Sequence, residues 1–213
     1  MKKKETIFQL LTQKPWDPAQ AKIDNMHDGE TLNLSKGKLG LRYIMIVSSI
    51  FFSLFIVTYA DRLVYADWQQ MPEPFLLWFN TLILFISSAV FISAQIAAKN
   101  NQFVKVKQKL LIIGYLALAF LLGQLLVWLQ LINLGYYVST NPANAYFYVF
   151  TALHGLHLIG GLVYWFMTIR KVWIPSNIVV ANAKHTVELC AIYWHFLLAV
   201  WVCLLYTSEA ADE

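Results

Sequence analysis

Residues 75–98 read FLLWFNTLILFISSAVFISAQIAA, a run without a single charged side chain. An α-helix rises about 1.5 Å per residue, so a segment of this length crosses the roughly 30 Å hydrocarbon core of a bilayer. Four further apolar segments cover residues 43–60, 110–134, 145–169 and 186–206. None alternates with the two-residue period of a barrel strand. The sequence therefore predicts an all-α polytopic membrane protein with five transmembrane helices.

The composition supports this fold class. Hydrophobic residues make up 59% of the chain and charged residues 13%, and the mean hydropathy of +0.54 excludes an ordinary soluble domain. We expect an N-terminal tail at 1–40, a membrane domain at 41–208 and an acidic C-terminus at 209–213. The longest apolar run of the tail, residues 7–11, is too short for the core of a signal peptide. The loops are too short to hold a separate catalytic domain.

The lysines and arginines are divided unevenly between the two sides of the predicted membrane. The N-terminal tail holds eight of them, the second loop four and the fourth loop three, whereas Arg62 alone lies on the opposite side. Because basic loops stay in the cytoplasm, we predict a cytoplasmic N-terminus and an outer C-terminus. The same bias accounts for the sequence pI near 9.0, so we do not expect nucleic acid as a partner.

Titratable side chains within the apolar segments gather in the last two. His154 and His157 stand three residues apart in the fourth segment, and Gly161 follows four residues later on the same face. Glu188 and His195 are seven residues apart in the fifth segment, which is about two helical turns. We expect these two polar faces to meet.

Glu188 is the acidic side chain of this set. A carboxylate in hydrocarbon is costly, so Glu188 is expected to be protonated, to reach the cytoplasmic interface, or to pair with a histidine of the preceding segment. Three glycines of that segment, Gly155, Gly160 and Gly161, would let the two backbones approach closely enough for such a pair.

Other functions compete with simple helix packing for these residues. His157 and His195 on neighbouring helices could ligate one haem between them. A di-metal site would need more than the five histidines of this chain. A proton path needs titratable groups through the bilayer, but the first three segments hold no Asp or Glu in their interiors. Helix packing is the favoured interpretation, with haem ligation and proton or ion movement left open.

Two further features lie within the segments. Cys190 and Cys203 are thirteen residues apart in one predicted helix, about 20 Å along its axis, so we expect packing residues and no disulfide between them. Gln124, beside Gly123, is a polar side chain near the middle of the third segment with no obvious charge opposite it. Amides and hydroxyls at such positions usually hydrogen bond one helix to another.

Two motifs of the last segments carry a family resemblance. The sequence HGLHLIGG at residues 154–161, followed by YWHF at 193–196, resembles subunit III of haem-copper respiratory oxidases, the cytochrome c and quinol oxidases. Stretches at 40–46, 73–88 and 123–128 are similar to the third, fourth and fifth helices of that family. The resemblance spans residues 37–206 and fits the five-helix form, which lacks the first two helices of the longer version. It implies a packing and hydrogen-bonding role for His154, Gly155, His157, Gly161, Glu188, Tyr193, Trp194, His195 and Trp201.

The resemblance also implies partners and a place of action. A subunit III is expected to be non-catalytic and to hold no haem, copper or other metal itself, since haem and copper belong to the partner subunits. It packs on the large catalytic subunit I, binds structural phospholipid and stabilises an aerobic complex that reduces dioxygen and pumps protons. The expected location is the bacterial inner membrane. Two alternatives stay open: a related subunit of nitric-oxide reductase, and a small haem b electron carrier.

The chain departs from the family pattern at three acidic positions. Residues 48–55 read SSIFFSLF, without the membrane-embedded glutamate that many members carry there. Val127 and Leu198 stand where a glutamate and an aspartate are common. The resemblance therefore favours structural support and lipid binding over an acid-dependent role in proton uptake.

Overall fold

A computed structural model describes residues 36–69, 71, 74–173 and 179–209. This part of the chain is built from helices and contains no strand. All five helices are long and apolar enough to cross a membrane, so the predicted all-α class is confirmed. The predicted tail up to residue 35 and the C-terminus from residue 210 lie outside the described residues. The helices are α3 (Lys36–Arg62), α4 (Phe75–Lys99), α5 (Phe103–Asn133), α6 (Pro142–Trp173) and α7 (Val179–Glu209).

Most of the helices extend beyond the apolar segments that predict them. Helix α3 begins at Lys36 instead of residue 43, α5 at Phe103 instead of 110, and α7 at Val179 instead of 186. Lysine is a good helix former, so the basic ends of these segments continue the helix outside the apolar span. The chain divides into two units after Arg42. Of the first unit the structure describes only residues 36–42, the start of α3.

A tight turn joins α4 to α5. Asn101 adopts a left-handed backbone conformation with φ of 57°, which asparagine tolerates better than most residues. The Gln102 amide then donates to the Ala97 carbonyl at 2.9 Å. Further along, the Lys109 ammonium donates to the Ser93 carbonyl at 3.1 Å and also to the Ser93 hydroxyl. These bonds fix the antiparallel register of the two helices.

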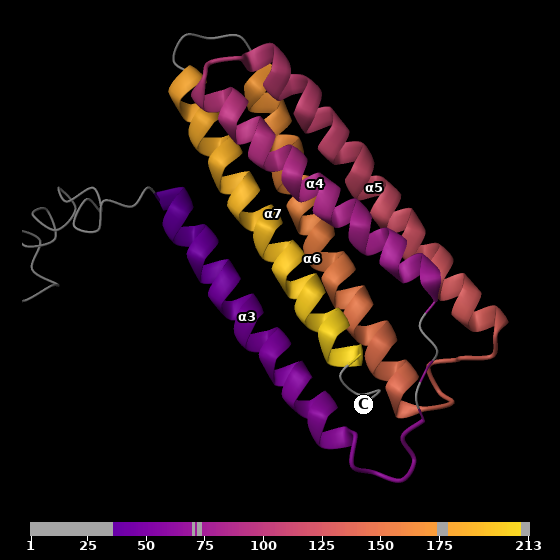
Figure 1. The fold of residues 1–213 in the computed structure, drawn as a ribbon. Coiled ribbons are helices and arrows are strands. Elements are labelled where there is room, and N and C mark those ends of the chain that lie inside the picture. The colour runs from indigo at the N-terminus through magenta and orange to yellow at the C-terminus, as the bar shows by residue number, and fades with distance from the viewer. Residues whose placement is uncertain (1–35, 70, 72–73, 174–178, 210–213) are drawn as a thin grey trace, which may run out of the picture. The chain divides into compact units, whose positions relative to one another are not determined.

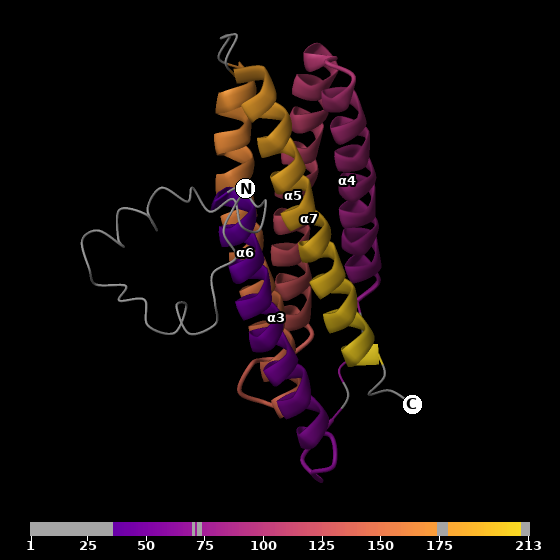
Figure 2. The ribbon, with the colours of Figure 1, turned by 90° about the vertical axis from the view of Figure 1, so that its left-hand side faces the viewer.

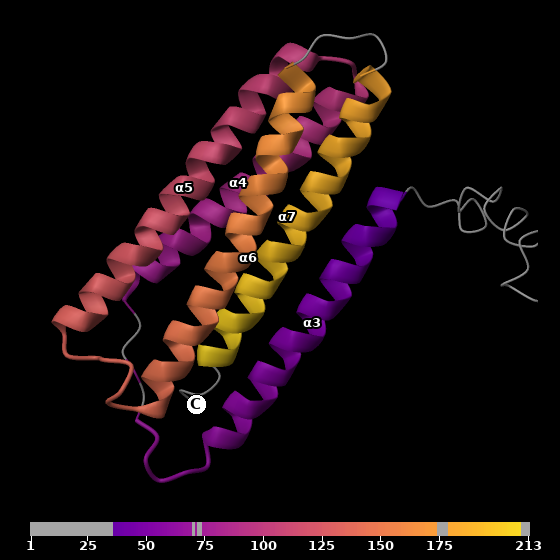
Figure 3. The same cartoon turned by 180° about the vertical axis from the view of Figure 1, so that it is seen from behind.

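Helices α4 to α7 pack as a closed set of four (Figures 1 and 2). Helix α4 lies against α5, α5 against α6, α6 against α7, and α7 against α4. We call this set the four-helix ring. Figure 3 shows it from behind, with α5 and α6 in view. The ring brings the two histidine-bearing helices, α6 and α7, against each other and also brings α7 against α4.

Close approach within the ring depends on a glycine of α5. A Cβ atom added at Gly114 would overlap the Trp165 ring of α6. The indole nitrogen of Trp165 donates to the Leu110 carbonyl of α5 at 2.8 Å, so this ring is held against the α5 backbone. A side chain at residue 114 would push α5 and α6 apart.

Helix α3 packs differently from the other four. No described residue of α3 has its Cα within 8 Å of another helix's Cα. Contact is made by large side chains instead: Phe52 and Tyr59 are buried in one cluster with Phe150 of α6 and with Val200 and Leu204 of α7. Aromatic rings thus span the wider gap between α3 and the ring.

Candidate functional site

His154 lies inside the four-helix ring. Its side chain is fully buried, with the ring of Phe120 of α5 at 5.9 Å and that of Trp201 of α7 at 4.9 Å between centroids. Neither imidazole nitrogen has a hydrogen-bond partner within the described residues. His154 is therefore surrounded by aromatic side chains of two neighbouring helices and is not paired with a charge.

His157, three residues later, faces α3. Its Nδ1 lies 2.8 Å from the Leu153 carbonyl, and its Nε2 lies 3.1 Å from the Ser48 hydroxyl of α3. The ring of Phe52 packs on it at 5.1 Å between centroids. Because a carbonyl can only accept, Nδ1 is the donor, and Nε2 of the neutral imidazole accepts from the serine. His157 thus hydrogen bonds α3 to the four-helix ring.

Two tryptophans of α7 are hydrogen bonded to α4. The indole nitrogen of Trp194 donates to the Ser87 hydroxyl at 2.9 Å, and that of Trp201 donates to the Thr81 hydroxyl at 3.0 Å. Both indoles are buried, so the bonds lie in a medium where an unpaired N–H would be costly. They connect the first and last helices of the ring.

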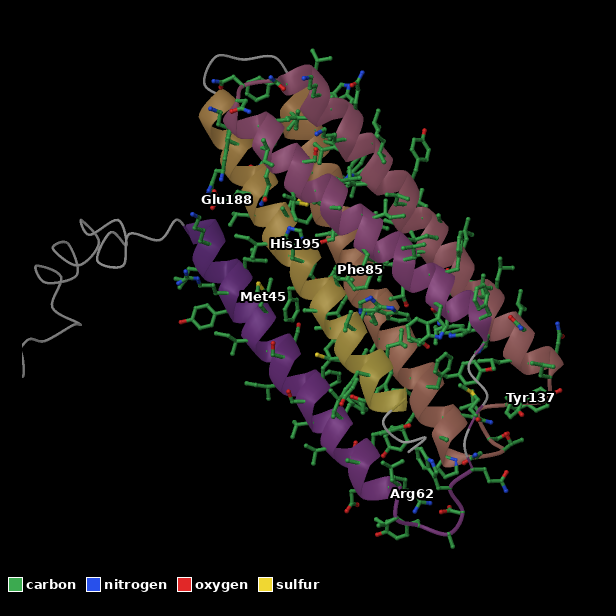
Figure 4. The ribbon with its side chains drawn as sticks, viewed as in Figure 1. Met45, Arg62, Phe85, Tyr137, Glu188 and His195 are labelled. Carbon is green, nitrogen blue, oxygen red and sulfur yellow. The ribbon has the colours of Figure 1, made fainter. Side chains whose placement is uncertain are left out.

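His195 also faces α4, whereas Glu188 lies near the start of α7 (Figure 4). The Nδ1 atom of His195 lies 2.6 Å from the Ser88 hydroxyl. The carboxylate of Glu188 lies 3.9 Å from Nδ1 of His185 on the same helix, and 47% of its side chain is exposed. Glu188 is thus an exposed side chain on the surface of α7, and its position at the cytoplasmic interface stays a prediction.

The expected pairing of Glu188 with His154 or His157 is wrong. Among the described residues neither nitrogen of His154 has a partner, and both nitrogens of His157 have partners other than Glu188. The reason is the register of α6 against α7. The Tyr193 hydroxyl of α7 donates to the His157 carbonyl of α6 at 3.2 Å. Glu188 lies five residues before Tyr193, about 7 Å farther along the helix, and cannot reach either imidazole.

Of the three glycines expected to allow close approach, Gly161 is the one in tight contact with α7. A Cβ added there would lie 3.1 Å from a Leu197 methyl and 3.2 Å from the Tyr193 ring. At Gly155 no atom would lie within 4 Å, and at Gly160 the nearest would be the Tyr193 hydroxyl at 3.9 Å. The HGLHLIGG motif therefore packs against α7 mainly through its last glycine.

The serines and threonine of α3 and α4 were expected to hydrogen bond one helix to another, but the side chain that each of them bonds was not predicted. Ser48, Thr81, Ser87 and Ser88 each bond a motif side chain. A partial signal was present in the spacing: Thr81 and Ser87 stand six residues apart on α4, and their partners Trp201 and Trp194 stand seven apart on α7. Two antiparallel helices that each carry such side chains about two turns apart can form these bonds at two levels.

The chemical capacity of these side chains is limited by the bonds they already make. The two imidazoles considered for haem ligation, His157 and His195, both bond serine hydroxyls. In the part of the chain that the structure describes, no group of three or more His, Cys, Asp or Glu side chains could hold a metal ion. Cys190 is buried and Cys203 exposed, and neither forms a disulfide. The arrangement is suited to joining helices.

A surface pocket lies between α4 and α7, on the side where α7 begins. Its volume is about 250 Å³. Two lysines and a glutamate give it a charged lining, and a glutamine, an alanine and an isoleucine complete the wall. The lining residues are Gln95, Ala98, Lys99, Lys184, Glu188 and Ile192.

Comparison with known proteins identifies relatives along most of the chain. No protein-family model matches the sequence. The cytochrome c oxidase subunit 3 of Thermostichus vulcanus is 31% identical over 188 residues, which cover 85% of this chain and 89% of that protein. The cytochrome bo(3) ubiquinol oxidase subunit 3 of Buchnera aphidicola is 31% identical over 182 residues, 81% of this chain and 90% of that protein.

A third relative, the cytochrome c oxidase subunit 3 of Synechocystis, is 31% identical over 167 residues, 76% of this chain and 70% of that protein. The aligned lengths exceed any single motif, so the likeness extends across several of the five apolar helices. The resemblance inferred from the two short motifs is confirmed. The chain belongs to the subunit III family of haem-copper respiratory oxidases.

Proposed function

We propose that this chain packs on the large catalytic subunit of its oxidase and stabilises the complex without taking part in electron transfer. The observation that carries the proposal is the identity of 31% to an oxidase subunit 3 over 85% of this chain. Dioxygen reduction and proton pumping are then activities of the assembly, and haem and copper belong to the partner subunits. The proposed location of this multi-pass chain is the bacterial inner membrane.

The contacts of the motif residues support a structural role. Ser48, Ser87 and Ser88 bond His157, Trp194 and His195. These bonds lie between helices, and each one gives its polar groups a partner inside the protein, which stabilises helix association in a membrane. Such a scaffold would present a fixed outer surface to a partner.

Phospholipid binding is the second part of the proposal, and the pocket between α4 and α7 supports it. Lys99 and Lys184 line it together with one carboxylate, Glu188, and with apolar Ala98 and Ile192, so the basic side chains outnumber the acidic one. Basic pockets between transmembrane helices suit anionic head groups, with the acyl chain along the apolar wall. The charge-based orientation puts this end of the helices at the cytoplasmic face, where anionic lipid is expected.

Co-purification tests the proposal directly. An affinity tag on this chain, used on native membranes solubilised in a mild detergent, should recover a haem-copper subunit I in equal amount, with haem absorption in the visible spectrum. Recovery of a nitric-oxide reductase large subunit would assign the chain to that complex instead. A Soret band from the isolated chain would identify it as a haem carrier, and a chain that migrates alone would contradict the proposal.

The lipid proposal has its own test. Native mass spectrometry of the purified complex should show retained anionic phospholipid that is lost in the Lys99→Gln/Lys184→Gln double variant. A matched Lys105→Gln control changes an exposed lysine of α5 outside this pocket. Equal lipid retention in the double variant and the control would rule out this pocket as the site.

A further inference from the structure

Three polar side chains inside the four-helix ring have no hydrogen-bond partner among the described residues. They are Asn80 of α4, Gln124 of α5 and His154 of α6, with exposed fractions of 1%, 5% and 0%. Both side-chain polar atoms of each residue, six atoms in all, are unpaired within the described part of the chain. Each residue comes from a different helix, so the set is not explained by one local turn.

Two contacts between α5 and α6 place Gln124 and His154 at the same depth. The Trp128 indole donates to the Thr151 hydroxyl at 3.0 Å, and the Phe120 ring lies 5.9 Å from the His154 ring. Gln124 lies midway between Phe120 and Trp128 in the sequence, four residues from each. His154 follows Thr151 by three residues. In an antiparallel pair these offsets bring Gln124 and His154 to one level.

Asn80 lies at this level too. Its side-chain amide is in contact with the α5 backbone at Gly123, where an added Cβ would overlap it. Its neighbour Thr81 accepts from the Trp201 indole at 3.0 Å, and the Trp201 ring lies 4.9 Å from His154. One layer across the ring therefore holds all three unpaired side chains.

The hydroxyl groups of this layer already have their own partners. Thr81 donates to the Leu77 carbonyl at 2.9 Å while it accepts from the Trp201 indole. Thr151 donates to the Phe147 carbonyl at 2.8 Å while it accepts from the Trp128 indole. Their protons are not available to the amides or to the imidazole. A further donor and acceptor is needed.

We propose that Asn80, Gln124 and His154 form an internal hydration site that holds a small cluster of ordered water molecules in the middle of the ring. Both amides and a neutral imidazole can each donate and accept, which matches water. The three side chains carry no fixed charge, so a bound ion would have no counter-charge from them. Buried water typically makes about three hydrogen bonds to groups that otherwise lack partners. This inference goes beyond the proposed function and does not depend on it.

Solid-state NMR of the full chain in lipid bilayers tests the site. With nitrogen-15 in the histidine and tryptophan side chains, magnetisation from water should reach the His154 nitrogens faster than the Trp194 indole nitrogen. Trp194 is equally buried but bonded to Ser87, so it serves as the dry reference, and the partly exposed His185 serves as the wet one. A His154→Phe variant assigns the signal.

Two results would overturn the proposal. One is transfer to His154 that is no faster than transfer to Trp194. The other is a direct bond from a His154 nitrogen to the Asn80 or Gln124 amide, seen as a through-space contact in the same sample. Either would show that the side chains pair with each other or remain dry.

A substitution pair gives an independent readout. In a hydrated layer, Gln124→Leu removes a wall of the water site and should lower both the Tm and the water transfer to His154. In a dry layer the same change removes an unpaired amide and should raise the Tm. Gln130→Leu, on an exposed position of α5, is the matched control and should leave the His154 signal unchanged. If Gln124→Leu does not fold, the wild-type NMR result still decides.

Discussion

The interface of α3 and the interior of the four-helix ring are held together by different means. Within the ring the backbones approach closely, and indole–hydroxyl bonds such as Trp194 to Ser87 are buried. Helix α3 keeps its backbone farther away and contacts the ring through rings such as Phe52 and through the bond from Ser48 to His157. The comparison indicates that the ring is the stable unit and that α3 is attached mainly through side chains, with one bond from the Tyr146 hydroxyl to the Thr58 carbonyl of α3.

The largest expected effect comes from separating two backbones of the ring. Gly114→Ala places a Cβ against the Trp165 ring, and overpacking of this kind costs about 1–3 kcal/mol. We expect a lower Tm in detergent by differential scanning fluorimetry. Gly155→Ala is the control, since an added Cβ there meets no atom within 4 Å. A Gly114→Ala protein as stable as this control would show that close approach at α5 and α6 is not required.

An intermediate effect is expected from the bond between α7 and α4. Trp194→Phe removes the indole N–H from the Ser87 hydroxyl and should destabilise the chain by about 1 kcal/mol beyond its packing loss. A double-mutant cycle with Ser87→Ala measures the coupling. Additive effects of the two single changes would mean that this bond contributes nothing.

The smallest effect is expected at α3. Ser48→Ala removes the hydroxyl that bonds His157 and should weaken α3 docking by about 0.5–1 kcal/mol. Spin labels on α3 and α6 should then report a broader distance distribution. Ser49→Ala is the control, since that exposed serine bonds the Met45 carbonyl of its own helix. Identical distributions for the two variants would contradict the role given to Ser48.

The five spans could be predicted from the sequence because apolar length is a local property. Helix ends could not, because residues such as Lys105 and Lys107 of α5 are polar yet remain helical. The length of an apolar segment reflects the thickness of the hydrocarbon layer. The end of the helix is set instead by capping residues and turns. The tight turn at Asn101 is one such end.

The site was predictable in part, and the limit was the register between helices. Residues three apart lie on the same side of a helix, which is why the sequence groups His154 with His157, yet they are about 60° apart around the axis. In α6 that angle separates a position inside the ring from one facing α3. Which residue meets Glu188 depends on how far α6 and α7 are shifted along each other, and no local pattern encodes that shift.

The most direct test of the central claim is a map of the purified complex by electron cryomicroscopy, at a resolution that shows side chains and bound groups. We predict that this chain lies against a haem-copper subunit I, with His154, His157 and His195 in contact with protein or water. Density for a porphyrin or a metal ion on any of these imidazoles would contradict the account.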